Sequence, residues 1–325
     1  MKKNVLSIVL FCTVFFAPFS MRANDAATLA ANISSFTGGG TGSLTAVASG
    51  NTVTVTGSLT GVTTQLALDI DAGVTVKWQA DISMGSGFTD YGLITVSGAG
   101  TFDVATGGSV MTTIDGGIAI STGLGFTISV SGGTVSATTG GAIDGSYPGF
   151  IIINDGMVSA TSGTAINNSS NTSLIVNGGV ISSTTGYSIT AGGNFDRGAT
   201  VTINNGTVST ITGHAIFGSI NTLVTVCGTG QVQATGDYST AISTWGSVEI
   251  KDNARVSATS GLAIYSSDYS DTYPCGNVEV SGGEVSATTG IAINASGGSS
   301  KVTVSGTGKV QKTAAIALLF IHLAT

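Results

Sequence analysis

Pairs of apolar residues spaced by two recur along most of the chain, about every 25 residues. Side chains two residues apart lie on the same face of a β-strand, so each pair predicts a short strand with one buried face. The pairs are Ile128/Val130, Ile151/Ile153, Leu174/Val176, Val201/Ile203, Val224/Val226, Val248/Ile250, Val278/Val280 and Val302/Val304.

Each pair is followed by a turn and then by two more short strands. The turn begins with a polar residue, normally followed by one or two glycines; polar side chains bond nearby backbone and glycine permits positive φ, so these segments are typical turns. A V-S-A-T strand follows, whose Val and Ala are expected to point inward, and an Ala-Ile strand completes the unit. The turn residues are Ser131, Asn154, Asn177, Asn204, Cys227, Asp252, Ser281 and Ser305.

The first apolar residue of the V-S-A-T strand marks eight copies of the unit, with spacings of 23 to 29 residues. This period is typical of a solenoid. Clustered glycines and many β-branched residues argue against a helical repeat. We therefore predict an all-β fold, a single-stranded right-handed parallel β-helix (β-solenoid) with about three short strands per coil and a rise of about 4.8 Å per coil. The eight residues are Val135, Val158, Ile181, Val208, Val232, Val256, Val285 and Val310.

The regular repeats span residues 90–312, and two different segments flank them. Residues 24–89 contain looser strand patterns and are expected to form an N-terminal cap and the first irregular coils. Residues 1–23 have the two lysines, apolar run and terminal small residue of a secretory signal peptide, which predicts export to the extracellular space or outer cell surface. The apolar tail 313–325 is expected to be either a C-terminal cap or a truncation scar, and neither apolar segment is long enough to span a membrane.

The repeated segments VSGGTVSATTG and VSGGEVSATTG, each followed by Ala-Ile, resemble secreted bacterial right-handed β-helix repeat proteins. Proteins of this kind are adhesin-like or carbohydrate-binding surface proteins, and the resemblance covers about residues 50–312. It implies the fold and a glycan or cell-surface protein as partner. Pectate-lyase-like enzymes share the fold, so the activity stays open.

Composition narrows the function classes further. Only 8% of the residues are charged and the net charge is −7, which argues against nucleic-acid binding. Beyond residue 23 the chain has two cysteines, Cys227 and Cys275, too few for a disulfide scaffold. Cys227 occupies the turn position and is interpreted as a small substitute for Ser or Asn. No cofactor is predicted, and the oligomeric state stays open.

A polysaccharide lyase or hydrolase would need clustered carboxylates together with a basic residue or calcium. The carboxylates here are mostly isolated. Glu249 and Glu279 occupy matching positions on successive coils and are expected to face solvent, and His214 is expected to be a solvated turn residue. We therefore predict no catalytic residues and keep such an enzyme as the alternative function.

The copies differ in length mainly after the Ala-Ile strand, which places the insertions on one edge of the solenoid. These segments are rich in aromatic residues that suit sugar or protein surfaces, although tyrosines can also simply cover loop backbone. We predict a non-enzymatic, adhesin-like protein that binds through this edge. The predicted ligand-binding residues are Tyr147, Phe195, Asp196, Arg197, Trp245, Tyr265, Tyr269 and Tyr273.

Two weaker hypotheses concern other polar groups. Asp268 and Asp271 are weak candidates for Ca²⁺ ligands, because nothing resembling a full oxygen cage surrounds them in the sequence. An outward row of Ser-x-Thr pairs, which begins with Ser136 and Thr138, resembles the flat hydroxyl surface of ice-binding solenoids. A solubilising β-face is the alternative interpretation of that row.

Overall fold

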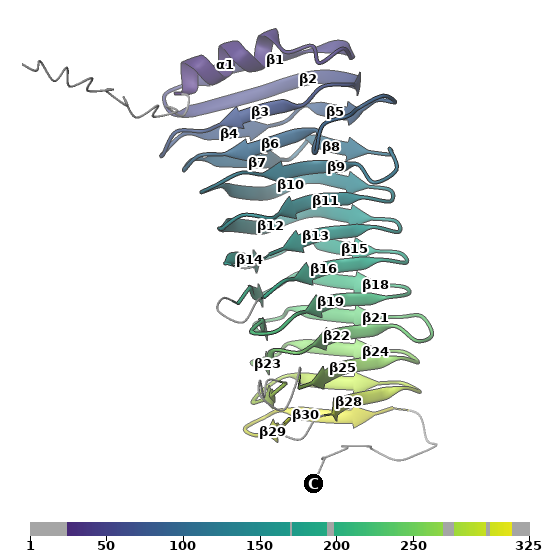
Figure 1. Cartoon of the computed structure of the whole chain (residues 1–325). Helices are drawn as coiled ribbons and strands as arrows, with labels where there is room; N and C mark the ends of the chain where they lie inside the picture. The colour runs from purple at the N-terminus through teal and green to yellow at the C-terminus, as the bar shows by residue number, and fades with distance from the viewer. Residues whose placement is uncertain (1–24, 170, 194–197, 269–275, 297–299, 314–325) are drawn as a thin grey trace, which may run out of the picture.

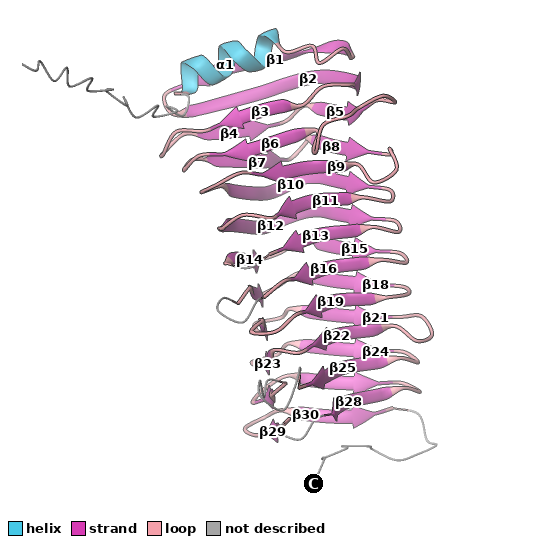
Figure 2. Cartoon of the chain, in the orientation of Figure 1, coloured by secondary structure: helices cyan, strands magenta, loops and turns pink. Residues whose placement is uncertain are grey.

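The computed structural model describes residues 25–169, 171–193, 198–268, 276–296 and 300–313. It is an elongated parallel β-solenoid of about ten turns (Figure 1), built from a 20-stranded and a 10-stranded sheet. Strands occupy nearly the whole length of the stack, and the described residues contain a single helix, at its N-terminal end (Figure 2). The predicted β-solenoid is therefore confirmed.

A regular coil contributes two strands to the 20-stranded sheet and one to the 10-stranded sheet. In one such coil these are β14 (Thr172–Val176), β15 (Val180–Ser183) and β16 (Tyr187–Ala191). Each strand pairs in parallel with the equivalent strand of the next coil, so that Val176 lies opposite Ile203 and Ile189 opposite Ile216. Register therefore follows the sequence repeat.

The strands of the 10-stranded sheet follow one another along the solenoid. They are β3 (Leu66–Asp69), β6 (Ile94–Ser97), β9 (Ile118–Thr122), β11 (Gly141–Gly145), β13 (Thr164–Asn168), β16, β19 (His214–Gly218), β22 (Thr240–Thr244), β25 (Leu262–Ser267) and β28 (Ile291–Ser296).

The other strands form the 20-stranded sheet, and three of them are long enough to continue through the turn. The long strands are β2 (Thr52–Val62), β10 (Thr127–Ala137) and β12 (Gly149–Ala160). The remaining strands are β1 (Thr41–Ser49), β4 (Thr75–Trp78), β5 (Asp81–Met84), β7 (Thr101–Ala105), β8 (Ser109–Thr112), β14, β15, β17 (Thr200–Ile203), β18 (Thr207–Thr210), β20 (Leu223–Val226), β21 (Gln231–Ala234), β23 (Ser247–Ile250), β24 (Arg255–Ala258), β26 (Val278–Val280), β27 (Glu284–Ala287), β29 (Val302–Val304) and β30 (Lys309–Lys312).

The core is a stack of inward side chains that matches the predicted pattern. Val135, Val158 and Val256 have no exposed surface, and the alanines two residues after them are also buried. Two coils replace the alanine by Ser183 and Thr210, whose hydroxyl oxygens lie 3.3 Å apart in a hydrogen bond. Because buried polar groups are costly unless paired, this mutual bond allows both to remain in the core.

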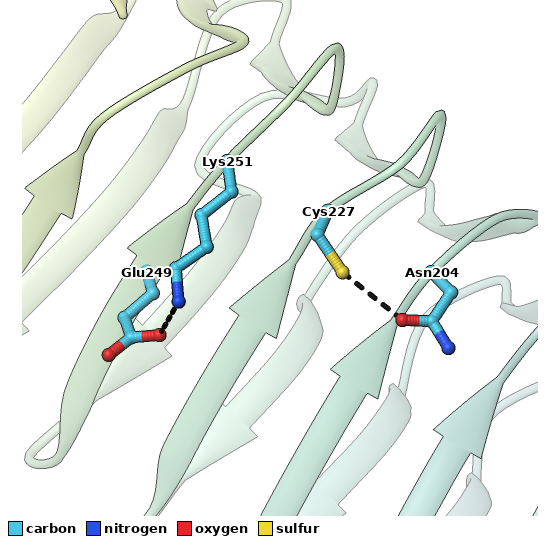
Figure 3. A network of polar contacts seen from close by, with 4 residues as sticks. All are labelled: Asn204, Cys227, Glu249 and Lys251. Atoms are coloured by element: carbon cyan, nitrogen blue, oxygen red, sulfur yellow. Dashed lines mark hydrogen bonds and ion pairs between the residues drawn. The ribbon is translucent and has the colours of Figure 1, made fainter. Parts of the chain in front are cut away.

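The predicted turn residues form a ladder of side-chain hydrogen bonds along the solenoid. Asn177 Nδ2 donates to Asn154 Oδ1 at 2.9 Å, and Asn204 Nδ2 donates to Asn177 Oδ1 at 2.8 Å. The free thiol of Cys227 donates to Asn204 Oδ1 at 3.1 Å (Figure 3). Burial and the nearby Asp252 raise the pKa of this thiol, which keeps its proton in place. Cys227 thus takes the place of Asn, as predicted, and Cys275 lies outside the described residues.

The N-terminal end is closed by a helix that the sequence analysis did not predict. Helix α1 (Ala26–Ser35) packs on the antiparallel hairpin of β1 and β2 and buries Leu29 and Ile33. Asp25 caps it by accepting a hydrogen bond from the Thr28 N–H at 2.8 Å. Ala26, Leu29, Ala30 and Ile33 have the spacing of one helical face, which would have predicted the helix.

The C-terminal coil contrasts with this closed end. Val302 is half-buried and Val304 is 46% exposed, whereas the equivalent valines of earlier coils are buried. The predicted signal peptide, residues 1–23, lies outside the described residues, as do residues 314–325 of the apolar tail. Within the described part of the chain, no helix has both the length and the apolar character needed to span a membrane.

Candidate functional site

The outward-facing side chains of the 10-stranded sheet include polar and aromatic groups, and we call this surface the outer face. The residue directly after each Ala-Ile pair, or after the equivalent pairs Leu93-Ile94 and Ser188-Ile189, projects outward, and the sheet register aligns these residues into a central ladder. Its members are Thr95, Ser121, Asp144, Asn167, Thr190, Phe217, Ser243, Tyr265 and Asn294.

A second row runs beside the central ladder, three residues earlier in each strand. The register aligns it equally well, and we call it the flanking ladder. Its members are Ile118, Gly141, Thr164, Tyr187, His214, Thr240, Leu262 and Ile291.

Asp144 is the centre of a hydrogen-bond network on the outer face, and it is only 4% exposed. Its Oδ1 accepts bonds from the Ser146 hydroxyl at 2.6 Å and from Asn167 Nδ2 at 2.9 Å, and its Oδ2 accepts one from the Tyr91 hydroxyl. The Thr190 hydroxyl extends the chain by donating to Asn167 Oδ1 at 2.9 Å. Four coils are therefore linked through neutral donors to one carboxylate.

Tyr91 lies just before β6 and reaches across the sheet to Asp144 on β11. The hydrogen bond to Asp144 is the main cause that raises the pKa of the Tyr91 phenol, with burial a smaller one. The phenol thus remains a donor, while the side chain as a whole is 61% exposed. This exposed ring, held in place by a buried carboxylate, forms a ridge across the outer face.

Two hollows lie on the outer face, the first lined by Tyr91 and the second by its partner Asp144. The first has a volume of about 790 Å³ and the second about 390 Å³. The first is lined by Gln65, Tyr91, Thr95, Ser121, Thr122, Gly123, Leu124, Ser146 and Tyr147. The second is lined by Gly116, Ile118, Thr139, Gly140, Gly141, Asp144, Gly163, Thr164, Asn167 and Thr190.

Glycines keep one side of the second hollow free of side chains. A Cβ on Gly140 would lie 1.9 Å from the Gly117 carbonyl oxygen, and a Cβ on Gly163 would lie 1.8 Å from that of Gly140. Since atoms cannot approach that closely, each stacked corner accepts only glycine. The glycines are therefore required by the close stacking of successive coils at this corner.

An aromatic cluster follows the second hollow along the face. The rings of Tyr187 and His214 stack with centroids 5.5 Å apart and planes 9° apart. Phe217 contacts Tyr187 at 5.7 Å and meets Trp245 edge-on at 5.7 Å. In the sheet register Tyr187 is the neighbour of Thr164 and Phe217 that of Thr190, so this cluster borders the residues that line the second hollow.

The expectation of a solvated turn residue at position 214 is wrong. His214 is the first residue of β19, half-buried in the aromatic cluster, and its Nδ1 has no hydrogen-bond partner among the described residues. Burial lowers the pKa of this imidazole, because the charged form would lose its hydration. Neutral His214 therefore acts here as an aromatic ring.

Three of the predicted ligand-binding residues lie on or beside the outer face. Tyr147 is 47% exposed and lines the first hollow, Trp245 joins the aromatic cluster, and Tyr265 belongs to the central ladder. The Tyr265 hydroxyl accepts a bond from Ser296 at 3.3 Å. The remaining predictions lie outside the described residues: Phe195, Asp196, Arg197, Tyr269 and Tyr273.

Five residues of this site were not predicted from the sequence: Tyr91, Asp144, Asn167, Tyr187 and Phe217. A signal for some of them was present, because Asp144, Asn167 and Phe217 directly follow an Ala-Ile pair just as Tyr265 does. Aligning that position along the repeats would have predicted the central ladder. Tyr91 had no such signal, since it precedes the first of the eight aligned copies and contacts a strand two coils further on.

Of the two weak candidates for calcium ligands, the structure describes one. Asp268 accepts a bond from the Ser300 hydroxyl at 3.2 Å, and Asp271 lies outside the described residues. Among the residues that the structure describes, no three His, Cys, Asp or Glu side chains are grouped to hold a metal. Glu249 and Glu279 are neighbours in the 20-stranded sheet, as predicted, and Glu249 forms an ion pair with Lys251 at 2.6 Å (Figure 3).

The outer face therefore combines a buried carboxylate network, two hollows and an aromatic cluster over successive coils. Neither a family model, nor a curated protein, nor a solved structure matches this chain.

Proposed function

We propose that this protein binds an extended glycan along the outer face and does not transform it chemically. The observation that carries the proposal is the aromatic cluster of Tyr187, His214, Phe217 and Trp245 beside a ladder of hydroxyl and amide groups. Aromatic rings stack on the apolar faces of sugars, while hydroxyl and amide groups bond sugar hydroxyls. The outer face offers both kinds of group side by side.

The dimensions of the face also favour a chain rather than a single sugar. Asp144 on β11 and Phe217 on β19 are separated by three strand-to-strand steps, or about 14 Å. The two hollows and the cluster thus form successive contact points along the solenoid axis. A linear polysaccharide lying parallel to that axis would meet all of them.

The cellular setting of the proposal comes from the sequence. The predicted signal peptide supports a location outside the cell, where the protein would act as an adhesin-like protein towards a glycan or the surface of another cell. The insertions that carry Phe195, Tyr269 and Tyr273 follow strands of the 10-stranded sheet, β16 and β25.

A polysaccharide lyase or hydrolase is the second candidate, and one observation favours it. Asp144 is a buried carboxylate that lines the second hollow, and Tyr91 lies directly against it. Most hydrolases of glycosidic bonds use two carboxylates, and among the residues that the structure describes Asp144 is the single acidic one lining either hollow. Incubation with soluble polysaccharides tests this candidate: new reducing ends or unsaturated products, abolished in Asp144→Asn, would establish it over simple binding.

A glycan array with purified mature protein tests the binding proposal, followed by calorimetry on any glycan retained. Tyr187→Ala and Trp245→Ala should each weaken binding at least tenfold, because each removes a ring of the aromatic cluster. Phe150→Ala is the matched control, since Phe150 is a 53% exposed aromatic residue on the 20-stranded sheet. Unchanged affinity in both cluster variants, or an equal loss in Phe150→Ala, would contradict the proposed site.

A further inference from the structure

We propose that the outer face selects neutral glycans and rejects polyuronates and sulfated glycans. This inference rests on the proposed glycan binding and adds the chemical class of the ligand. It follows from an uneven distribution of charge between the two sheets. Every Lys and Arg among the described residues lies in or beside a strand of the 20-stranded sheet: Lys77, Lys251, Arg255, Lys301, Lys309 and Lys312.

Apart from Lys301, which directly precedes β29, the charges of the 10-stranded sheet and its adjoining loops are acidic in the described part of the chain. Asp144 lines the second hollow, and Asp115 directly precedes Gly116 of the same hollow. Asp90 lies beside the first hollow, where its Oδ2 accepts a bond from the Gln65 N–H at 2.9 Å. Asp69 ends β3, the first strand of the sheet. A ligand on this face therefore meets negative charge at several points.

The hydrogen-bond partners of Asp144 bring no positive charge to the second hollow. Tyr91, Ser146 and Asn167 donate hydrogen bonds to the carboxylate, and all three are uncharged. Donors of this kind satisfy the oxygens of the carboxylate without supplying a counter-charge. The hydroxyl and amide groups around it can still bond the hydroxyls of a neutral sugar.

A carboxylate or sulfate brought into the second hollow would be repelled by Asp144. Two like charges about 6 Å apart in a site with an effective dielectric constant of about 20 weaken binding roughly a hundredfold, and solvent exposure reduces this to about tenfold. A neutral sugar of the same shape experiences no such repulsion. The charge of the ligand, rather than its size, should therefore decide whether it binds.

The test compares one polymer with and without charge. The neutral polysaccharide that binds best on the array is carboxymethylated, and both forms are titrated into the mature protein at 20 mM and 300 mM salt, with affinity measured by calorimetry. The charged form should bind about tenfold more weakly at low salt and recover at high salt, because salt screens the repulsion. The affinity of the neutral form should change little with salt.

A pair of lysine variants locates the effect. Thr164→Lys adds a positive charge to the second hollow, and Ser159→Lys adds the same charge to the same coil on the outward side of the 20-stranded sheet. Thr164→Lys should restore binding of the carboxymethylated polymer, whereas Ser159→Lys should not.

The outcomes separate the two proposals. Equal binding of the charged and neutral polymers, or equal effects of the two lysine variants, would overturn the selectivity while leaving glycan binding intact. If neither polymer nor any array glycan binds the wild-type protein, the proposed function itself fails and the selectivity fails with it.

Discussion

At the scale of single residues, Val256 and Ser257 are adjacent but face opposite sides of β24. Val256 has no exposed surface and lies between Val232 and Val285, whereas Ser257 faces outward between Gln233 and Ser286. Val256→Asp should cost several kcal/mol, because it buries a carboxylate without a partner. Ser257→Asp should change stability by no more than about 0.5 kcal/mol. Thermal unfolding followed by circular dichroism measures both, and equal destabilisation would contradict the strand register.

His214 should make stability depend on pH. Because burial lowers the pKa of this imidazole below its usual 6.5, the unfolded chain takes up a proton more readily than the folded chain. Stability should therefore be highest above about pH 6.5 and fall as the pH drops from there towards the lowered pKa. His214→Phe keeps an aromatic ring without a titrating group, so its urea midpoint should fall less than that of the wild type between pH 7.5 and pH 5. Identical pH profiles would show that His214 is not desolvated.

These residue-level results show which features a sequence predicts well. Burial of Val256 and exposure of Ser257 could be predicted because a period of two fixes the facing of every residue in a strand. The contact between Tyr91 and Asp144 could not, since it joins residues 53 positions apart through one side chain of an irregular segment. No repeat encodes such a contact. The outer face was therefore only partly predicted, through Tyr147, Trp245 and Tyr265.

At the scale of elements, the free energy of unfolding should fall with the number of hydrogen bonds that a variant removes from the turn ladder. Asn204 donates to Asn177 and accepts from Cys227, so Asn204→Ala removes two hydrogen bonds and should cost about 1–2 kcal/mol. Cys227→Ser retains a donor of similar size and should be nearly neutral, whereas Cys227→Val leaves Asn204 Oδ1 without this partner. Urea unfolding of the three variants checks the order. A Cys227→Ser variant less stable than Cys227→Val would contradict the ladder.

Helix α1 protects the N-terminal end of the stack, and it does so partly through the edge strand. The Ser34 hydroxyl accepts a hydrogen bond from the Ala46 N–H of β1 at 2.9 Å, which occupies a backbone group that could otherwise pair with another chain. Ile33→Asp places a charge in the buried helix interface and should release α1 from the end of the stack. Binding of a dye that reports exposed apolar surface should then increase, and so should self-association measured by light scattering. Asn32→Asp, on the exposed side of the helix, should leave both unchanged. Self-association in neither variant would mean that α1 does not shield this edge.

At the scale of the whole molecule, the solenoid could be predicted because each coil buries its apolar residues and turns its backbone in the same way. Valines, a polar turn and glycine corners recur in register, so one correctly interpreted coil predicts its neighbours. The repeat predicts neither the ends of the solenoid nor the outer face. Helix α1 occurs once, and the ridge and hollows depend on side chains that differ from coil to coil. The regular part of the sequence thus predicts the scaffold, and the irregular part determines the surface.

The stacking of coils also has a mechanical consequence. Consecutive coils are joined by one covalent connection and by hydrogen bonds between parallel strands, so a pull along the axis would detach one end coil at a time. Each detached coil of about 25 residues would add about 80 Å of extended chain. Pulling the protein from its C-terminal end in an optical trap should therefore give a series of small, evenly spaced extensions, whereas a single rupture would mean that the stack fails as a block. A protein anchored between two surfaces would in this way lengthen under load and dissipate energy before its attachment breaks.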